Sequence, residues 1–157
     1  MNADSSSSPA ERANREHVRI RQGIIDVREQ LRRAPSGLDS AEGDEWLAGI
    51  EKVVGHLREA VERHFHDEEC SGLFEEFQRQ YPRASDRLAR LKLQHSTILG
   101  ELNDLLTALV RCEGKAHPDA TEIVEQGMHA LGELARHEEE ETDILQRLPS
   151  EDIGIGD

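Results

Sequence analysis

The sequence predicts an all-α protein, an up-down-up-down four-helix bundle with a metal site in its core. First, charged residues make up 33% of the 157-residue chain and aromatic residues only 3%, a composition that suits solvated helices around an aliphatic interior. Second, four segments carry apolar residues at steps of three and four, the spacing of one helix face. Third, each of these apolar stripes includes a side chain that can bind metal, and the short connections favour antiparallel neighbours.

The first helix is expected to begin at Pro9 or Glu11 and to end at Arg33, because residues 34–37 (APSG) combine the two strongest helix breakers. Residues 1–10 are polar and rich in serine, and we expect a disordered N-terminal tail there. The stripe of this helix consists of His17, Ile20, Ile24, Val27 and Leu31.

The second helix is expected from about Asp44 to Glu69, before the Ser71-Gly72 pair. Residues 72–86 form the next connection, which contains helical fragments and ends at Ser85 or Asp86, either of which is a good N-cap. The stripe of the second helix consists of Ile50, Val54, Leu57, Val61, His64 and Glu68.

The third helix follows that N-cap and should stop where residues 113–118 (EGKAHP) bring Gly and Pro close together. Its apolar stripe keeps the helical period over more than five turns, with one histidine in it. The stripe consists of Leu88, Leu91, His95, Ile98, Leu102, Leu105 and Leu109.

The fourth helix is expected to start at Pro118 or Asp119 and to be ended by Pro149. Residues 11–149 then form one domain, and residues 150–157 a loose C-terminal tail. The fourth stripe consists of Ile123, Gly127, Ala130, Leu134, His137, Glu141, either Ile144 or Leu145, and Leu148.

The charge balance narrows the function classes. With 19 basic and 33 acidic residues the net charge is -14, so neither a nucleic acid nor an anionic membrane is an expected partner. The chain has no apolar run of membrane-spanning length, and residues 1–16 contain no apolar stretch of the secretory type. We therefore expect a cytoplasmic protein. Cys70 and Cys112 are the only cysteines, so a disulfide framework is not indicated, and the sequence does not identify a role for either.

Six metal-chelating residues occupy stripe positions where a bundle would otherwise place leucine. Buried imidazoles and carboxylates without partners are costly, and a bound metal pair satisfies all of them together. Antiparallel packing brings the four histidines to similar heights, because each residue adds about 1.5 Å along a helix. Two H-x-x-x-E pairs each offer a nitrogen and a carboxylate from one face. The predicted ligands are His17, His64, Glu68, His95, His137 and Glu141.

The remaining histidines and acids have simpler interpretations. His56 flanks its stripe and Glu133 lies one turn before His137, so either could orient a ligand, although Glu133 is more simply read as exposed. Residues off the stripes are expected to face solvent. These are His66, His117, His129, Asp67, Glu69, Glu138, Glu139 and Glu140.

Two other classes of helical bundle compete with this interpretation. Ferritin-like carboxylate proteins bind two irons through E-x-x-H motifs, but no glutamate in this chain has a histidine three residues later. A purely structural or interaction bundle would have no need of the six residues. Metal analysis of the purified protein separates this last class from a metalloprotein.

The motifs HFHDEE (64–69), LKLQHSTIL (91–99) and LARHEEEE (134–141) resemble the hemerythrin-like, or HHE cation-binding, family over residues 11–148. The resemblance implies a four-helix bundle with two non-haem iron ions in an Fe-O-Fe type centre; other transition metals would fit the same donors. It also implies that His17 and His64 bind one iron, that His95 and His137 bind the other, and that Glu68 and Glu141 bridge them.

One departure from the family pattern bears on reactivity. Oxygen-carrying hemerythrins have two histidines one turn apart on the third helix, whereas here Leu91 and Leu99 flank His95. Fewer ligands leave more open coordination positions, which is the mark of a reactive rather than a closed metal site. We therefore expect a protein that reacts with or senses oxygen, peroxide or nitric oxide. The alternative is reversible oxygen binding, or iron storage, without catalysis; the sequence does not decide whether the protein is an enzyme.

Overall fold

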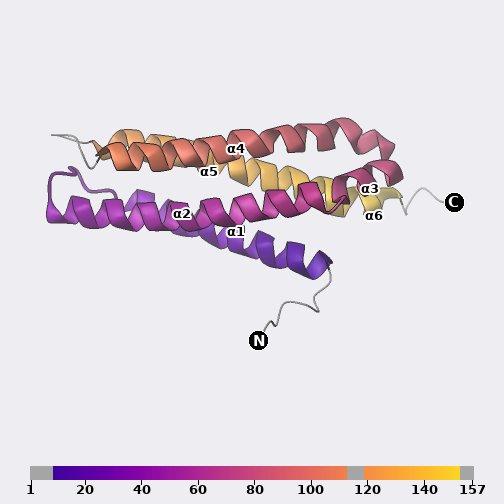
Figure 1. The fold of residues 1–157 in the computed structure, drawn as a ribbon, viewed down its shortest axis with the longest axis horizontal. Coiled ribbons are helices and arrows are strands. Elements are labelled where there is room, and N and C mark those ends of the chain that lie inside the picture. The colour runs from indigo at the N-terminus through magenta and orange to yellow at the C-terminus, as the bar shows by residue number, and fades with distance from the viewer. Residues whose placement is uncertain (1–8, 113–118, 153–157) are drawn as a thin grey trace.

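The computed structural model describes residues 9–112 and 119–152, and confirms the predicted all-helical fold. No strand occurs among the residues described. Four long helices form a bundle, with two short ones at one end (Figure 1). The helices are α1 (Pro9–Arg32), α2 (Ala41–Cys70), α3 (Leu73–Gln80), α4 (Ser85–Cys112), α5 (Ala120–Thr142) and α6 (Leu148–Asp152).

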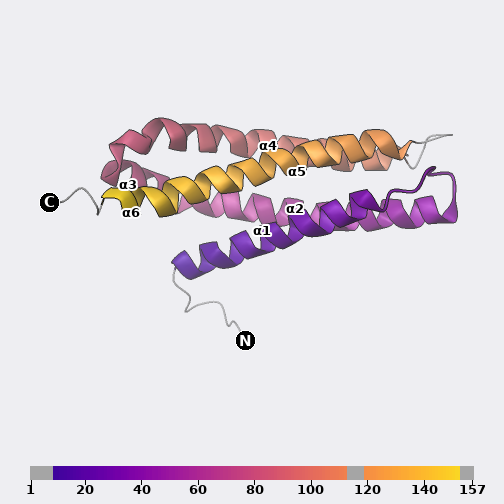
Figure 2. The same cartoon turned by 180° about the vertical axis from the view of Figure 1, so that it is seen from behind.

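Each long helix packs against two others. α1 lies against α2 and α5, and α4 lies against the same two from the other side. The chain therefore runs around the bundle in the order α1, α2, α4, α5, and the two opposite views show these neighbours side by side (Figures 1 and 2). A reversal made by α3 and a single 3₁₀ turn, Pro82–Ala84, connects α2 to α4.

The predicted helix boundaries are close to the observed ones, except that one helix begins earlier in the chain than predicted. Helix α2 begins at Ala41, three residues before the predicted Asp44, because Ser40 is its N-cap. The hydroxyl of Ser40 accepts the backbone N–H of Gly43 at 3.0 Å, and so satisfies one of the orphan donors of the first turn. Asp119 caps α5 in the same way through the N–H of Thr121 at 2.9 Å.

Every apolar member of the four predicted stripes up to Leu134 is buried. Most join one large core along α1, α2, α4 and α5. A second, smaller cluster lies under α3, at the end of the bundle where the chain turns into α4. This second cluster consists of Phe74, Phe77, Ala84, Leu88, Leu91 and Ile144.

Pro149 does not end the last helix, contrary to the sequence prediction. Helical structure continues beyond α5 as one π-helical turn, Asp143–Arg147, and then as α6. Pro149 is the second residue of α6, and the first turn of a helix tolerates proline because its N–H groups have no intrahelical acceptor. The wider π turn keeps Ile144 fully buried, while Leu145 is only partly buried.

Some predictions fall on other parts of the chain. Most of the predicted N-terminal tail and of the C-terminal tail, and the break at 113–118, lie outside the described residues. Within the described ranges, no helix is both long and apolar enough to cross a membrane.

Candidate metal centre

The six predicted ligands meet inside the bundle, toward the end where α2 finishes and α4 begins. Five of them are no more than 5% exposed, and the side chain of His17 is 15% exposed. Helix α1 supplies His17, α2 supplies His64 and Glu68, α4 supplies His95, and α5 supplies His137 and Glu141.

Their ligand atoms fall into two groups. Around what we call the α1–α2 position, Nε2 of His17 lies 3.3 Å from Glu141, and Nε2 of His64 lies 2.7 Å from Glu68. Around the α4–α5 position, Nε2 of His95 lies 3.3 Å from Glu68, and Nε2 of His137 lies 3.6 Å from Glu141. Both carboxylates therefore reach both positions. Ligand atoms of His17, His64, Glu68 and Glu141, one from each residue, lie within 4.8 Å of one another, and so do those of Glu68, His95 and His137.

Several of these atoms have no hydrogen-bond partner among the described residues although they are buried. Both oxygens of Glu68 and of Glu141 are in this state, and so is Nε2 of His64. The 2.7 Å approach of His64 to Glu68 is an ion-pair distance without hydrogen-bond geometry. Buried polar atoms are normally paired, and imidazole nitrogens and carboxylate oxygens that converge in this way are a donor set that suits a shared cation. The residues present therefore fit a pair of metal ions.

A second set of contacts orients the four imidazoles. In each, Nδ1 lies within hydrogen-bond distance of an oxygen acceptor. When the ring is neutral and Nδ1 carries its proton, the lone pair of Nε2 is directed to the centre. Each acceptor lies on the helix that precedes the histidine's own helix in the order α1, α2, α4, α5. An acceptor on α1 therefore faces a histidine on α2, one on α2 faces α4, one on α4 faces α5, and one on α5 faces α1. We call this closed set the orienting ring. Its donor–acceptor pairs are His64 to Glu16 (3.1 Å), His95 to Glu69 (2.8 Å), His137 to Gln94 (2.8 Å) and His17 to Glu138 (2.6 Å).

The sequence analysis missed the orienting ring, and it assigned two of its members to a solvated face. Glu138 is buried instead, and Glu69, although half exposed, contacts His95. The signal that could have found the ring is adjacency, because each acceptor is the immediate chain neighbour of a predicted ligand. The suggested orienting residues have other surroundings. His56 lines a surface groove beside Glu16, and Glu133 pairs with Arg136.

Aromatic rings close the α4–α5 position. Phe65 stacks on His95 with ring centroids 3.8 Å apart and 8° between the planes, and its edge meets His137 at 5.0 Å. Phe74 lies 6.1 Å from His95 on another side. Phe65 is 2% exposed, so these rings shield the two imidazoles from water.

The electrostatics of the metal-free centre follow from the same contacts. Burial lowers the pKa of His17 and of His64, but the negative charges of the glutamates close to them outweigh it and raise these pKa values to about 9 and about 11. Burial, with the other imidazoles, lowers the pKa of His137 to about 4. Burial raises the pKa of Glu68, whereas the imidazoles of His17 and His64 beside Glu141 outweigh burial and hold the pKa of Glu141 well below its usual range.

A cavity of about 540 Å³ leads from the surface to the α1–α2 position. Its inner wall is made of buried ligands, among them His64 and Glu141, and its outer wall includes the exposed side chains of Leu73 and Cys70. The thiol of Cys70 therefore lies beside this entrance, with its sulfur 3.7 Å from the ring nitrogens of His66. The α1–α2 position is thus open to small molecules, in contrast to the aromatic enclosure of the α4–α5 position.

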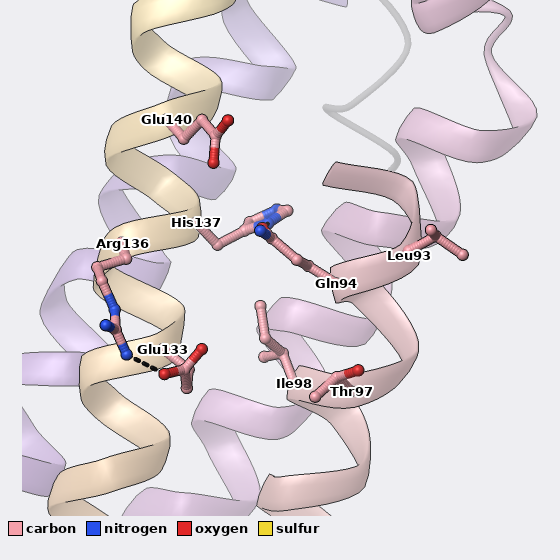
Figure 3. Close-up of a pocket in the computed structure, with 8 residues that line it drawn as sticks. All are labelled: Leu93, Gln94, Thr97, Ile98, Glu133, Arg136, His137 and Glu140. Atoms are coloured by element: carbon pink, nitrogen blue, oxygen red, sulfur yellow. Dashed lines mark hydrogen bonds and ion pairs between the residues drawn. The ribbon is translucent and has the colours of Figure 1, made fainter. Parts of the chain in front are cut away.

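A second cleft of about 380 Å³ lies between α4 and α5 and reaches His137. Gln94 and His137 extend toward one another from opposite helices within it, and Glu133 pairs with Arg136 on the α5 side (Figure 3). Thr97 lines the same cleft one turn along α4 from Gln94. Gln94 and the imidazole that it orients therefore both line this cleft.

Comparison with known proteins gives one match. The family model described as the hemerythrin HHE cation binding domain matches residues 8–148. Neither the curated proteins nor the solved structures contain a significant match.

Proposed function

Because the chain belongs to the hemerythrin HHE cation-binding domain family, we propose that it holds two non-haem iron ions in its core and reacts with or senses oxygen, peroxide or nitric oxide. One observation carries the proposal: four imidazole nitrogens and two carboxylates converge while their buried atoms lack other partners. A cytoplasmic location, as expected from the sequence, is part of the same proposal.

In this proposal each histidine pair holds one iron. His17 and His64 would bind at the α1–α2 position, and His95 and His137 at the α4–α5 position. Glu68 and Glu141 would bridge the two ions, since their oxygens reach both groups. When bound, iron supplies reversible electron transfer and a Lewis acid for oxygen- or nitrogen-containing ligands.

The protein's own contribution is access and orientation. The orienting ring fixes each imidazole before any metal arrives, which lowers the cost of binding. Phe65 and Phe74 exclude water from one position, while the cavity beside Leu73 leaves the other accessible. A small neutral ligand would therefore approach from the α1–α2 side, through this cavity. The acidic chain, with its net charge of -14, does not favour a nucleic-acid partner.

Iron loading with metal analysis tests the proposal. We expect about two irons per chain and near-ultraviolet absorption in the oxidised protein. His95→Ala should lower the iron content, and His129→Ala is the matched control, since it removes an exposed histidine of α5. A protein from iron-replete cells that contains no metal and takes up none on reconstitution would contradict the proposal.

Mixing the reduced, iron-loaded protein with each ligand identifies the reaction. Rapid oxidation by oxygen or peroxide, or a stable nitric oxide spectrum, is the expected result. An oxygen complex that persists and releases oxygen under vacuum would instead favour the alternative, a reversible binding protein. Leu99→His adds an imidazole one turn from His95 and should lengthen the life of any oxygen complex.

A further inference from the structure

The orienting ring contains one member that differs chemically from the rest. Three acceptors are carboxylates, and the fourth, on His137, is the neutral amide of Gln94. The carboxylates also differ in burial. The side chains of Glu16 and Glu138 are 13% and 9% exposed, whereas that of Glu69 is 48% exposed. The two metal positions are therefore supported unequally.

This inequality has an electronic consequence. A carboxylate that accepts the Nδ1–H of an imidazole makes Nε2 a stronger donor, and the effect is greater in a buried, low-dielectric setting. Each imidazole of the α1–α2 position has a carboxylate behind it that is at most 13% exposed. At the α4–α5 position one imidazole has a half-exposed carboxylate and the other has an amide. The α1–α2 position thus favours the more highly charged ion.

We propose that Gln94 is a positioning residue that makes the two iron positions unequal in reduction potential. When one electron from a chemical reductant enters the diferric protein, the α4–α5 ion becomes ferrous and the α1–α2 ion stays ferric. This inference depends on the proposed function, because it requires two bound irons. It concerns the second coordination shell, so it does not follow from the identity of the six ligands.

The cleft outside Gln94 gives a physical reason for an amide at this place. Glu133 and Glu140 already line the cleft, with Arg136 as the cation beside them. A glutamate at position 94 would add a third carboxylate there and would also back His137 with a negative charge. The neutral amide of Gln94 accepts the hydrogen bond from His137 without placing a negative charge behind that imidazole.

Reductive titration of the iron-loaded full chain, followed by electron paramagnetic resonance, tests the inference. The largest yield of the mixed-valent signal measures the separation between the two one-electron steps. Gln94→Glu should raise the ferric preference of the α4–α5 position about tenfold, the lower end of the range for such partners. The reduction potentials of the two one-electron steps then become more similar, and the yield of the mixed-valent signal falls. Glu69→Gln should separate them and raise the yield, and Glu138→Gln should lower it.

Thr97→Glu is the matched control, since it adds the same charge to the same cleft without touching an imidazole. We expect its mixed-valent yield to match that of the unmodified protein. Circular dichroism and iron content verify that each variant is folded and loaded. If Gln94→Glu does not fold, Glu69→Gln still decides, because that carboxylate is half exposed.

The signs of the changes assign the ferrous position. A higher yield in Gln94→Glu, or a lower one in Glu69→Gln, would overturn the inference, and so would an equal fall in Thr97→Glu. These outcomes differ from failure of the proposed function, in which the unmodified protein would bind no iron and give no mixed-valent signal.

Discussion

The two ends of the bundle are built on the same four helical stripes but are completed by different means. At the end we call the apolar end, the stripes continue with Leu31, Ile50, Leu105 and Leu109, all nearly inaccessible to solvent. At the metal end the same stripes place histidine and glutamate. Protein atoms alone fill the apolar end, whereas the metal end leaves buried lone pairs without partners. Helical phase thus decides which side chains are buried, and residue type decides whether the buried atoms find partners within the protein.

Removal of the metal should have the largest effect on this comparison. A ligand that binds only the folded state stabilises it by about 4 kcal/mol at a free concentration 1,000 times its Kd. Urea unfolding of the metal-free and iron-loaded proteins should therefore give clearly separated midpoints. Coincident transitions would mean that the metal end is as complete without a cation as the apolar end is.

A cavity at the apolar end should cost about 2–5 kcal/mol, whether or not metal is bound. Leu105→Ala tests this, because Leu105 is 1% exposed and lies in the large core, away from the ligands. The same loss should appear in both forms, with iron content unchanged in the loaded protein. A loss of iron in this variant would show that the two ends are mechanically coupled.

The metal end should respond to substitution with the opposite sign. Folding raises the pKa of Glu68, chiefly through burial, so the metal-free fold disfavours its charge. Glu68→Leu should abolish iron binding yet stabilise the metal-free protein by about 1–3 kcal/mol, because it removes a buried carboxyl that has no hydrogen bond and leaves Glu141 beside His64. Glu51→Leu, at an exposed position of α2, serves as control and should change neither quantity much. Greater instability of metal-free Glu68→Leu would refute the comparison.

The last effect, the response of the metal-free protein to alkali, accumulates gradually with pH. Between pH 6.5 and about 9 the folded protein holds protons on His17 and His64 that the unfolded chain releases. Stability should therefore fall as pH rises through this window, by at most about 1.4 kcal/mol per pH unit for each proton. The depressed pKa of His137, about 4, acts only below pH 6.5. Iron-loaded protein should lack this slope, and a slope of the same size there would contradict the assignment to ligand histidines.

The sequence was sufficient for the fold because helical periodicity is a local signal. All four stripes, from Ile20 on α1 to Leu134 on α5, are buried as predicted. The six proposed ligands were accessible to the same reasoning, since phase and height along the helices brought them together. The helical position of Pro149 could not be predicted in this way. A proline in the first turn of a new helix has the same sequence signal as a proline that ends a helix, and only the preceding π turn distinguishes the two.

The orienting ring was hidden for a different reason. Its members lie one residue away from a stripe, where a side chain can turn either to solvent or to the neighbouring helix. Glu138 and Glu139 are adjacent and identical, yet only Glu138 is buried. The choice depends on which helix stands next to α5, and that is a property of the whole bundle rather than of the local pattern.

The contact that closes the orienting ring between α5 and α1 can form only late in synthesis of the chain. His17 and Glu138 are 121 residues apart, so the imidazole made first waits for one of the last acceptors to be synthesised. While a ribosome is still translating α5, helices α1, α2 and α4 can already associate, but only His64 and His95 would have both their acceptor and their own helix in place. We therefore expect a cation to bind only after α5 has been synthesised, because a nascent chain without α5 lacks part of the predicted ligand set.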